Sequence, residues 1–246
     1  MTTFPFILQG TITDFDGSTA LASAKVIAKN LVSSESTSTT TNASGQYVLD
    51  LANMANGYSV GDVIYVKSFS GIRIRIGSFT ITQAMIDGGG HTLSFTVYGL
   101  REHVFDTMFS LYNANLPPDF TDTDGSTTVS WKVTAAMPED NPEFPVIIIN
   151  PAGVKVNLLT MDKSQSDDDI TVETEYFSRA RFTKGRIDIG RDYIHNVLLQ
   201  NQSFLEFSGL DFAVPEFIDD SNIGNFEVSG QKYNIANQIV KFGWNP

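Results

Sequence analysis

Residues 170–182 read ITVETEYFSRARF and form the most regular strand pattern in the chain. One face of this strand, from Ile170 to Phe182, carries only uncharged side chains. Because successive side chains of a strand point to opposite sides, the other face carries the charged residues Glu173, Glu175, Arg179 and Arg181. At about 3.3 Å per residue, the segment would span roughly 40 Å, which is longer than a small sheet needs. We therefore expect a long strand that projects toward a neighbouring chain or a lumen.

The segments around this strand predict an α+β domain over residues 100–246. Apolar residues at spacings of three and four predict helices over residues 101–113 and 186–200, and a short helical turn over 203–207. Apolar or alternating runs predict further strands over residues 127–134, 144–149, 154–161, 210–217 and 231–244. We also expect a turn over 218–222 and a bulge or bend in the last strand. This order is typical of an antiparallel sheet with two helices on one face.

Residues 1–99 follow a different pattern. Short strands alternate with turn signals, which predicts an all-β sandwich. The expected strands are 7–13, 24–28, 45–51, 63–68, 73–80 and 92–98. We therefore expect two domains, a sandwich accessory domain over residues 1–99 and the α+β domain over residues 100–246.

The net charge also differs between residues 1–99 and residues 100–246. The whole sequence has 28 acidic and 16 basic residues, a net charge of −12. Residues 1–99 hold six acidic and five basic residues, which leaves −11 of the net charge on residues 100–246. Such acidity argues against a protein that wraps nucleic acid, and the absence of cysteine excludes disulfides and thiolate chemistry. No secretion signal and no apolar run of membrane-spanning length occurs, so we expect a protein that stays where it is made, with no membrane partner.

Three phrases mark the first domain: GTITD followed by Gly17 (residues 10–17), LASAKV (21–26) and TNASGQYVL (41–49). Together they resemble the carboxypeptidase-regulatory, or transthyretin-like, sandwich family. The pattern of that family is a G-x-V-x-D strand and turn, an L-x-x-A-x-V strand and a T-x-x-x-G-x-Y/F strand entry. Ser23 stands where the family often has glycine. The resemblance covers about residues 6–98 and implies an Ig-like or transthyretin-like architecture without any particular chemistry.

The second domain contains its own order of phrases. The first helix leads into LPP (116–118), and FPVIIINP (144–151) ends a strand in a proline turn. The long strand then runs into a helix, SFLEFSGL (203–210) follows, and the last strand ends at Trp244. This order resembles the tail terminator and related head-to-tail joining proteins of long-tailed bacterial and archaeal viruses. The resemblance covers roughly residues 101–246, although the region 127–161 is expanded and the minimal family lacks an N-terminal sandwich.

The second resemblance implies a homo-oligomeric ring, usually hexameric, in the tail or neck of a virion made in a host cytoplasm. Such a ring caps the tail tube, contacts the tube protein and the neck or connector protein, and lets DNA pass through its lumen. An acidic lumen would repel phosphates, and long exposed strands could pair edge to edge between subunits. The candidate lumen or subunit-contact residues are Asp167, Asp168, Asp169, Glu173, Glu175, Arg179 and Arg181. A solvated hairpin tip is the alternative for the three consecutive aspartates.

Signals for catalysis and for metal binding are weak. Two DxDG phrases (14–17 and 122–125) resemble the start of a calcium loop but lack the glutamate at its twelfth position, and turn chemistry explains both. The three histidines are isolated, and no phosphate loop or nucleophile motif occurs. We therefore expect no enzyme activity, no cofactor and no metal. Two other functions stay open: an extracellular or virion-surface carbohydrate-binding adhesion protein, and an intracellular scaffold.

Overall fold

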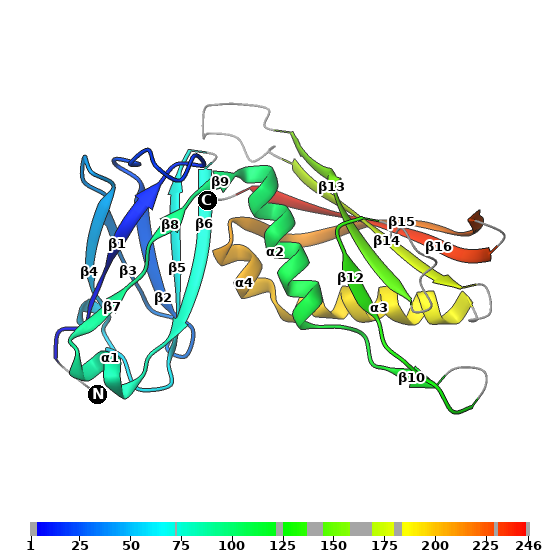
Figure 1. Cartoon of the computed structure of the whole chain (residues 1–246), viewed down its shortest axis with the longest axis horizontal. Helices are drawn as coiled ribbons and strands as arrows, with labels where there is room; N and C mark the ends of the chain where they lie inside the picture. Colours follow the sequence, from blue (N-terminus) through cyan, green and yellow to red (C-terminus); the bar gives the residue numbers. More distant parts are fainter. Residues whose placement is uncertain are drawn as a thin grey trace. The chain divides into compact units, whose positions relative to one another are not determined.

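The computed structural model in Figure 1 describes residues 4–71, 73–121, 125–136, 145–157, 169–179, 184–228 and 231–244. The chain divides into two compact units, which we call the first unit (Met1–His103) and the second unit (Val104–Pro246). Strands predominate in both units, and a few helices accompany them. The fold is therefore β-rich and of the α+β type.

The first unit contains two sheets. In the smaller sheet, β1 pairs in antiparallel fashion with β4 and in parallel fashion with β7 and β8. The bounds of its strands are β1 (Ile7–Thr13), β4 (Gln46–Asp50), β7 (Gly90–Thr92) and β8 (Phe95–Thr96). The larger sheet is antiparallel, in the order β3 (Ser36–Thr40), β2 (Lys25–Asn30), β5 (Val63–Ser70), β6 (Arg73–Thr80) and β9 (Tyr98–Gly99). A 3-10 turn, η1 (Leu51–Asn53), and a short helix, α1 (Gln83–Asp87), connect strands.

One hydrophobic core lies between these two sheets. The smaller sheet contributes Leu8 and Ile12 from alternate positions of β1, and the larger sheet contributes Val26, Ile64 and Val66. Because inward residues alternate with outward ones, each strand presents its remaining side chains to the outside. The outward face of the smaller sheet carries the groove described below.

The second unit is built on a five-stranded sheet in the order β12-β13-β14-β16-β15. The bounds of these strands are β12 (Lys132–Thr134), β13 (Val146–Asn157), β14 (Asp169–Arg179), β15 (Leu210–Val228) and β16 (Gln231–Trp244). All neighbouring pairs are antiparallel except β12 and β13, which are parallel. A separate two-stranded ribbon joins β10 (Phe120–Thr121) to β11 (Thr128–Val129).

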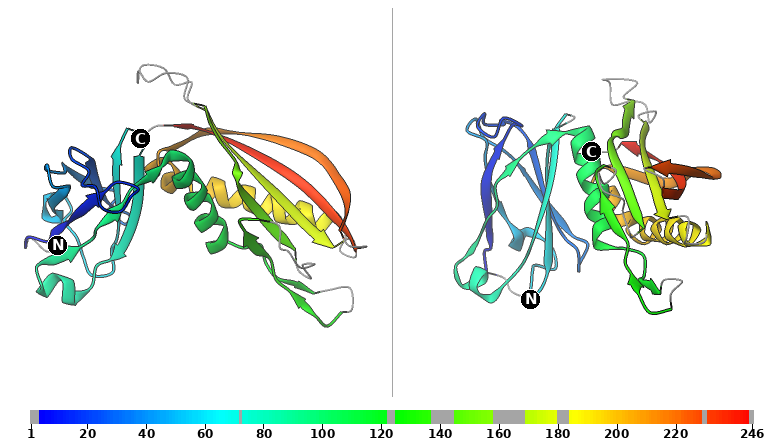
Figure 2. Two further views of the ribbon diagram at one scale, coloured as in Figure 1. Left: turned by 45° about the horizontal axis from the view of Figure 1, so that its top comes forward. Right: turned by 45° about the vertical axis from the view of Figure 1, so that its right-hand side comes forward.

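Helices cover one face of this sheet. They are α2 (Leu100–Ala114), α3 (Lys184–Gln200) and α4 (Gln202–Phe207), and Figure 2 shows α3 running along the sheet in both views. Alternate residues of β14, from Ile170 to Tyr176, are buried beneath the helices. Trp131 is also buried, and its ring lies so close to Gly190 of α3 that only a residue without a side chain fits there.

The structure corrects several expectations about strands. The expected strand over 92–98 is divided among β7, β8 and β9, which belong to two sheets. The described parts of the expected strands over 144–149 and 154–161 belong to one strand, β13, whose pairing with β14 shifts register between Ile149 and Val154. Residues 144 and 158–161 lie outside the described residues. The expected strand over 127–134 is interrupted between β11 and β12, and the expected all-antiparallel sheet contains one parallel pair. The expected turn over 218–222 lies inside β15. Pairing with the long neighbour β16 keeps this polar segment extended, and a register shift between Asp220 and Gly224 accommodates it.

The bulge expected in the last strand is absent from its pairing with β14. Registration between β14 and β16 is continuous from Asp169↔Gly243 to Arg179↔Tyr233. The two apolar phases of β16 occupy opposite faces instead, because Val240 and Phe242 are buried whereas Ile235 and Ile239 are half-exposed on the other side. The irregularities lie in β15, which has extra residues between its pairs with β16.

Candidate functional site

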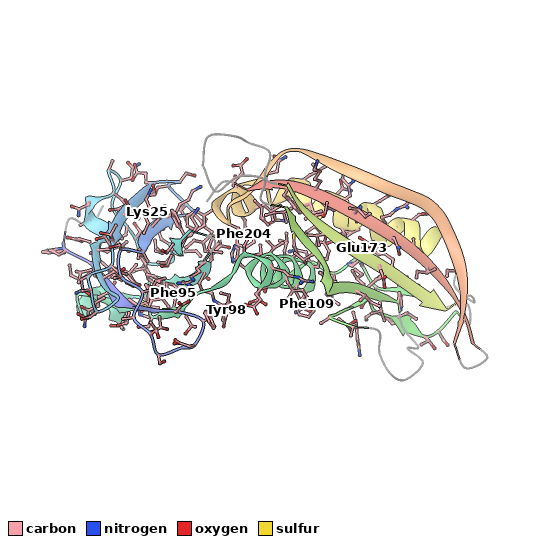
Figure 3. All side chains as sticks on the ribbon, turned by 90° about the horizontal axis from the view of Figure 1, so that it is seen from above. Lys25, Phe95, Tyr98, Phe109, Glu173 and Phe204 are labelled. Atoms are coloured by element: carbon pink, nitrogen blue, oxygen red, sulfur yellow. The ribbon has the colours of Figure 1, made fainter. Side chains whose placement is uncertain are left out.

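The side of the sheet that the helices leave uncovered is the first candidate surface. We call it the open face, and its described residues are Thr171, Glu173 and Glu175 of β14 and Ile235, Asn237, Ile239, Lys241 and Gly243 of β16. All eight are half-exposed, in contrast to the buried residues that alternate with them. Figure 3 labels Glu173 on this sheet. A central strand with apolar side chains on both faces is typical of a sheet that is covered on both sides.

The open face contains two of the seven candidate residues predicted from the sequence. Glu173 and Glu175 point to the same side of β14, as the alternation predicts. Asp169 and Arg179 form the two ends of β14, and nothing is described of their side chains. Asp167, Asp168 and Arg181 lie outside the described residues.

Two groups on the open face are in unfavourable surroundings. Burial raises the pKa of Glu175, and the neighbouring charge of Glu173 raises it further. Asn237, which is paired in register with Glu175, has a buried side-chain oxygen that accepts no hydrogen bond from the described part of the chain. A carboxylate beside a like charge lowers the stability of the fold, and so does a buried oxygen without a hydrogen-bond donor. Such unfavourable groups concentrate at functional surfaces.

The edge of the sheet beside the open face is acidic. β15 is the last strand in the sheet order, so it has a neighbour on one side only within the described part of the chain. Its 19 residues include five acidic residues and no lysine or arginine. Charges, a proline and bulges protect edge strands from unspecific pairing, and β15 has all three, including Pro215.

A buried polar layer supports the open face from behind. The Tyr176 hydroxyl donates a 2.6 Å hydrogen bond to Oε1 of Gln238, and both side chains are buried. Tyr112 of α2 is also fully buried, and burial raises the pKa of both tyrosines. The hydrogen bond crosses from β14 to β16, so it fixes the two strands that carry the open face.

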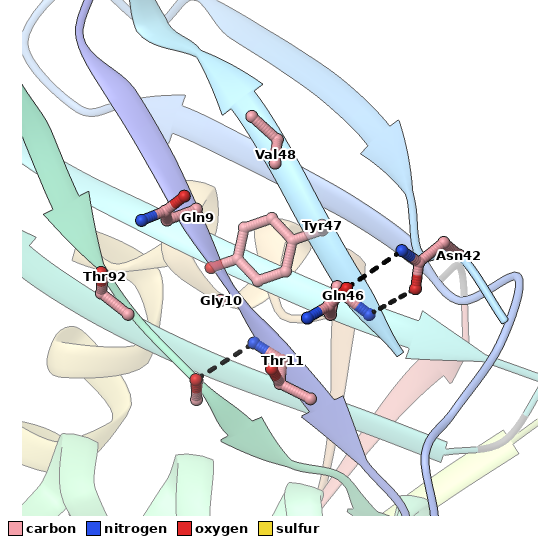
Figure 4. Close-up of a pocket in the computed structure, with 9 residues that line it drawn as sticks. Gln9, Gly10, Thr11, Asn42, Gln46, Tyr47, Val48 and Thr92 are labelled. Atoms are coloured by element: carbon pink, nitrogen blue, oxygen red, sulfur yellow. Dashed lines mark hydrogen bonds between the residues drawn. The ribbon is translucent and has the colours of Figure 1, made fainter. Parts of the chain in front are cut away.

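A second candidate surface is a groove of about 410 Å³ on the outward face of the smaller sheet in the first unit (Figure 4). We call it the Gln9 groove, and it is lined by Gln9, Gly10, Thr11, Asn42, Gln46, Tyr47, Val48, Thr92 and Ser94. None of the nine is charged. Sequence reasoning missed this site, because its residues come from strands that are about 80 positions apart and carry no motif of their own.

The phrases that resemble the transthyretin-like family have structural roles in the first unit. A side chain on Gly10 would collide with the Leu93 carbonyl oxygen, and the Tyr47 hydroxyl donates a 2.6 Å hydrogen bond to that same oxygen. Thr41 Oγ1 donates to the Leu21 carbonyl at 2.6 Å and accepts from the Ala24 amide at 2.9 Å. These residues hold loops and strands together, so the three phrases point to architecture rather than to chemistry.

The acidic turn at Asp14 and Asp16 is satisfied by the protein itself. Asp14 pairs with Arg73 at 2.8 Å, and Asp16 accepts hydrogen bonds from the backbone and side chain of Thr19 and from the Ser18 amide. These bonds lower the pKa of Asp16 to about 2. Among the described residues, no group of three acidic or histidine side chains is placed to hold a metal ion, and Asp122 and Asp124 lie outside them.

Comparisons with known proteins give no family. No family profile and no curated protein matches the sequence. Among solved structures, the chain is similar to one described as a "putative membrane-associated protein of unknown function" from Bacteroides fragilis NCTC 9343, with 11% sequence identity, 98% of each chain covered and a TM-score of 0.26. None of the described helices is long and apolar enough to cross a membrane.

Proposed function

We propose that the chain is a structural virion protein that forms a ring at the end of a viral tail or at the head–tail junction. The ring, which we take to be hexameric, caps the tail tube, joins it to the neck and lets DNA pass. The observation that carries this proposal is the open face, which combines half-exposed isoleucines, an unsatisfied Asn237 oxygen and two adjacent glutamates. We assign it no enzymatic activity.

The open face is suited to contact with a second copy of the chain. Ile235 and Ile239 provide apolar area, and a neighbouring subunit can supply a donor to the Asn237 oxygen. A basic side chain of the neighbour beside Glu175 would offset the repulsion from Glu173. Every copy would contact its two neighbours through the same pair of surfaces. Such head-to-tail contacts form a closed ring when the rotation between successive copies adds up to a full turn.

The acidic edge strand β15 is suited to the lumen. Five acidic residues without a basic one give this strand a uniform negative charge. Phosphates bind tightly where lysine and arginine gather, so a surface of the opposite sign lets DNA slide past. In this account the acidity of the second unit reflects passage of DNA without retention.

The finer fold assignments belong to the same proposal. The order of helices and strands in the second unit supports a tail-terminator-like domain, and the structural roles of Gly10, Thr41 and Tyr47 support an Ig-like or transthyretin-like sandwich in the first unit. The sandwich would then decorate or reinforce the ring from its outside.

Negative-stain electron microscopy of the purified chain tests the proposal. We expect closed rings with six-fold symmetry. Replacing Ile239 by aspartate should abolish the rings, because a charge would enter the apolar part of the subunit contact. Ile189→Asp is the matched control, because Ile189 is 53% exposed on α3 and lies outside the open face. A strict monomer that binds glycans would instead favour an adhesion protein.

A further inference from the structure

The Gln9 groove forms where strand pairing is interrupted. β1 pairs with β7 as far as Gln9↔Thr92 and resumes pairing with β8 at Ile12↔Phe95. Between these pairs the Leu93 amide donates to the Gln9 carbonyl at 2.8 Å, and the Thr11 amide donates to Ser94 Oγ at 3.0 Å. The backbone is thus satisfied without a regular ladder. The detour of the chain at Leu93 and Ser94 leaves a depression beside β1 (Figure 4).

The registers arrange the outward side chains of the groove in two rows. Val48, Gln9 and Thr92 lie across the three strands in one row. Gln46 and Thr11 are paired in the next row, and Ser94 continues it through its hydrogen bond to the Thr11 amide. With strands about 4.8 Å apart and rows about 7 Å apart, the array measures roughly 10 Å by 7 Å. A volume of about 410 Å³ is within the range of small-molecule sites.

The groove offers neutral groups that can both donate and accept hydrogen bonds. Glutamine amides and threonine hydroxyls each do both, which matches the hydroxyl groups of a sugar. Gln9 and Thr92 make no side-chain hydrogen bond within the described part of the chain, so both are available to a ligand. Val48 is 60% exposed in the same row and provides an apolar contact for the C–H face of a sugar ring.

The floor of the groove is fixed before any ligand arrives. The Tyr47 hydroxyl holds the Leu93 carbonyl at 2.6 Å, and Asn42 accepts hydrogen bonds from the Ser44 and Gln46 amides at 2.9 and 3.0 Å. The Asn42 side-chain amide also donates to Gln46 Oε1 at 3.3 Å, which orients the Gln46 side chain. Such preorganisation reduces the entropy that binding would otherwise cost.

We propose that the Gln9 groove binds a neutral saccharide, with Gln9, Gln46 and Thr92 bonding its hydroxyl groups and Val48 contacting its ring. The absence of charge among the nine lining residues makes a neutral ligand the best match. The groove lies wholly in the first unit, whereas the proposed subunit contacts lie in the second unit.

The test is an NMR titration of the full-length, ¹⁵N-labelled chain with maltose, cellobiose, lactose and N,N′-diacetylchitobiose. Concentrations up to about 20 mM are needed, because a few hydrogen bonds give affinities in the millimolar range. We expect at least one of these saccharides to shift the side-chain amide signals of Gln9 and Gln46. Binding should change less than about twofold between 0.05 and 0.5 M NaCl, since no ion pair contributes.

Variants decide whether the groove is the site. Gln9→Ala and Gln46→Ala should each weaken binding by about threefold to tenfold. Gln202→Ala, an exposed glutamine on α4 of the second unit, is the matched control and should bind like the parent. Three results would overturn the proposal. They are unchanged affinity of both groove variants, shifts confined to other residues, and no shift with any of the four saccharides. N-acetyl-trialanine amide, titrated in the same way, tests for an extended peptide as the ligand, and shifts produced by it alone would also overturn the proposal.

Discussion

At several glycines of this chain, neighbouring atoms leave no room for a Cβ atom, and Gly190 is the clearest example. A Cβ atom built on Gly190 would lie 2.4, 2.7 and 3.0 Å from three ring atoms of Trp131. The ring is 2% exposed, so it has little room to move away. Glycine normally weakens a helix relative to alanine, and its presence within α3 is explained by the indole ring.

Gly190→Ala should therefore destabilise the chain although it improves helix propensity. We expect a loss of about 1–3 kcal/mol in the free energy of unfolding from overpacking, against a gain below about 1 kcal/mol from propensity. Denaturant titration measures the difference. Asn196→Ala, at an exposed position of the same helix, should be neutral or slightly stabilising. A stabilising Gly190→Ala would contradict the packing of Trp131 against α3.

Glu175 gives a prediction about pH. Because burial and Glu173 raise the pKa of Glu175 in the folded chain, the unfolded chain releases this proton first as the pH rises. The free energy of unfolding should therefore fall from about pH 4.5 up to the folded pKa and stay lower above it. Glu175→Gln should be more stable than the parent at pH 7, and the difference should shrink below about pH 4.5.

Chemical denaturation at pH 4 and pH 7 measures this effect. Glu206→Gln, at an exposed position on α4, is the control for a change of one carboxylate to an amide. An equal effect of Glu175→Gln at both pH values would show that Glu175 is not held in an unfavourable position.

The candidate residues differed in how far the sequence could predict them. Alternation along one strand places Glu173 and Glu175 on the face opposite Ile170, because side-chain direction in a strand is a local property. The Gln9 groove has no such local signal. It depends on parallel pairing of Gln9 with Thr92, which are far apart in sequence, and on a detour of the chain at Leu93.

Among the elements, the antiparallel pair of β14 and β16 lies in the middle of the second unit's five-stranded sheet. β14 and β16 are paired without a register shift over the length of β14. A buried tyrosine–glutamine hydrogen bond crosses this pair between Tyr176 and Gln238. Polar groups in a core specify register, since a slip of the strands would leave both unsatisfied.

Tyr176→Phe should lower the free energy of unfolding by about 1–3 kcal/mol, because the Gln238 oxygen would stay buried without its donor. The double variant Tyr176→Phe with Gln238→Met should lose less than the sum of the two single variants, since both polar partners are then removed. Thermal or chemical denaturation of the four proteins gives the coupling energy. Strict additivity would contradict a direct bond between the two side chains.

Helices were easier to predict from sequence than strand boundaries. Apolar spacing within one segment predicts the helices at 101–113 and 186–200, which the structure places at Leu100–Ala114 and Lys184–Gln200. The polar run at 218–222 has the composition of a turn, yet it lies within β15 because β16 pairs with it on both sides of a register shift. Tertiary pairing overrides local composition at such points.

At the scale of the whole molecule, the two units differ in charge and in the surface that each offers. The first unit is close to neutral and carries the uncharged Gln9 groove, whereas nearly all the net charge lies in the second unit with the open face and β15. This division fits the two roles proposed above, which are binding of a neutral saccharide by the first unit and ring assembly by the second.

Deletion of residues 1–98 should leave ring assembly intact, because the proposed subunit contacts lie in the second unit. Negative-stain microscopy of the truncated chain, beside the full-length chain, measures this. Circular dichroism should first establish that the truncated chain is folded. Loss of rings in a folded truncated chain would place part of the subunit contact in the first unit.

Native mass spectrometry of the full-length chain tests directly whether copies of the chain assemble through the open face. If the open face joins copies into a hexameric ring, the dominant species should have the mass of six copies of the 27.0 kDa chain, about 162 kDa. Ile239→Asp should shift it to the mass of one chain, and Ile189→Asp should leave it unchanged. A full-length chain that stays at 27.0 kDa at all concentrations would contradict ring assembly through the open face.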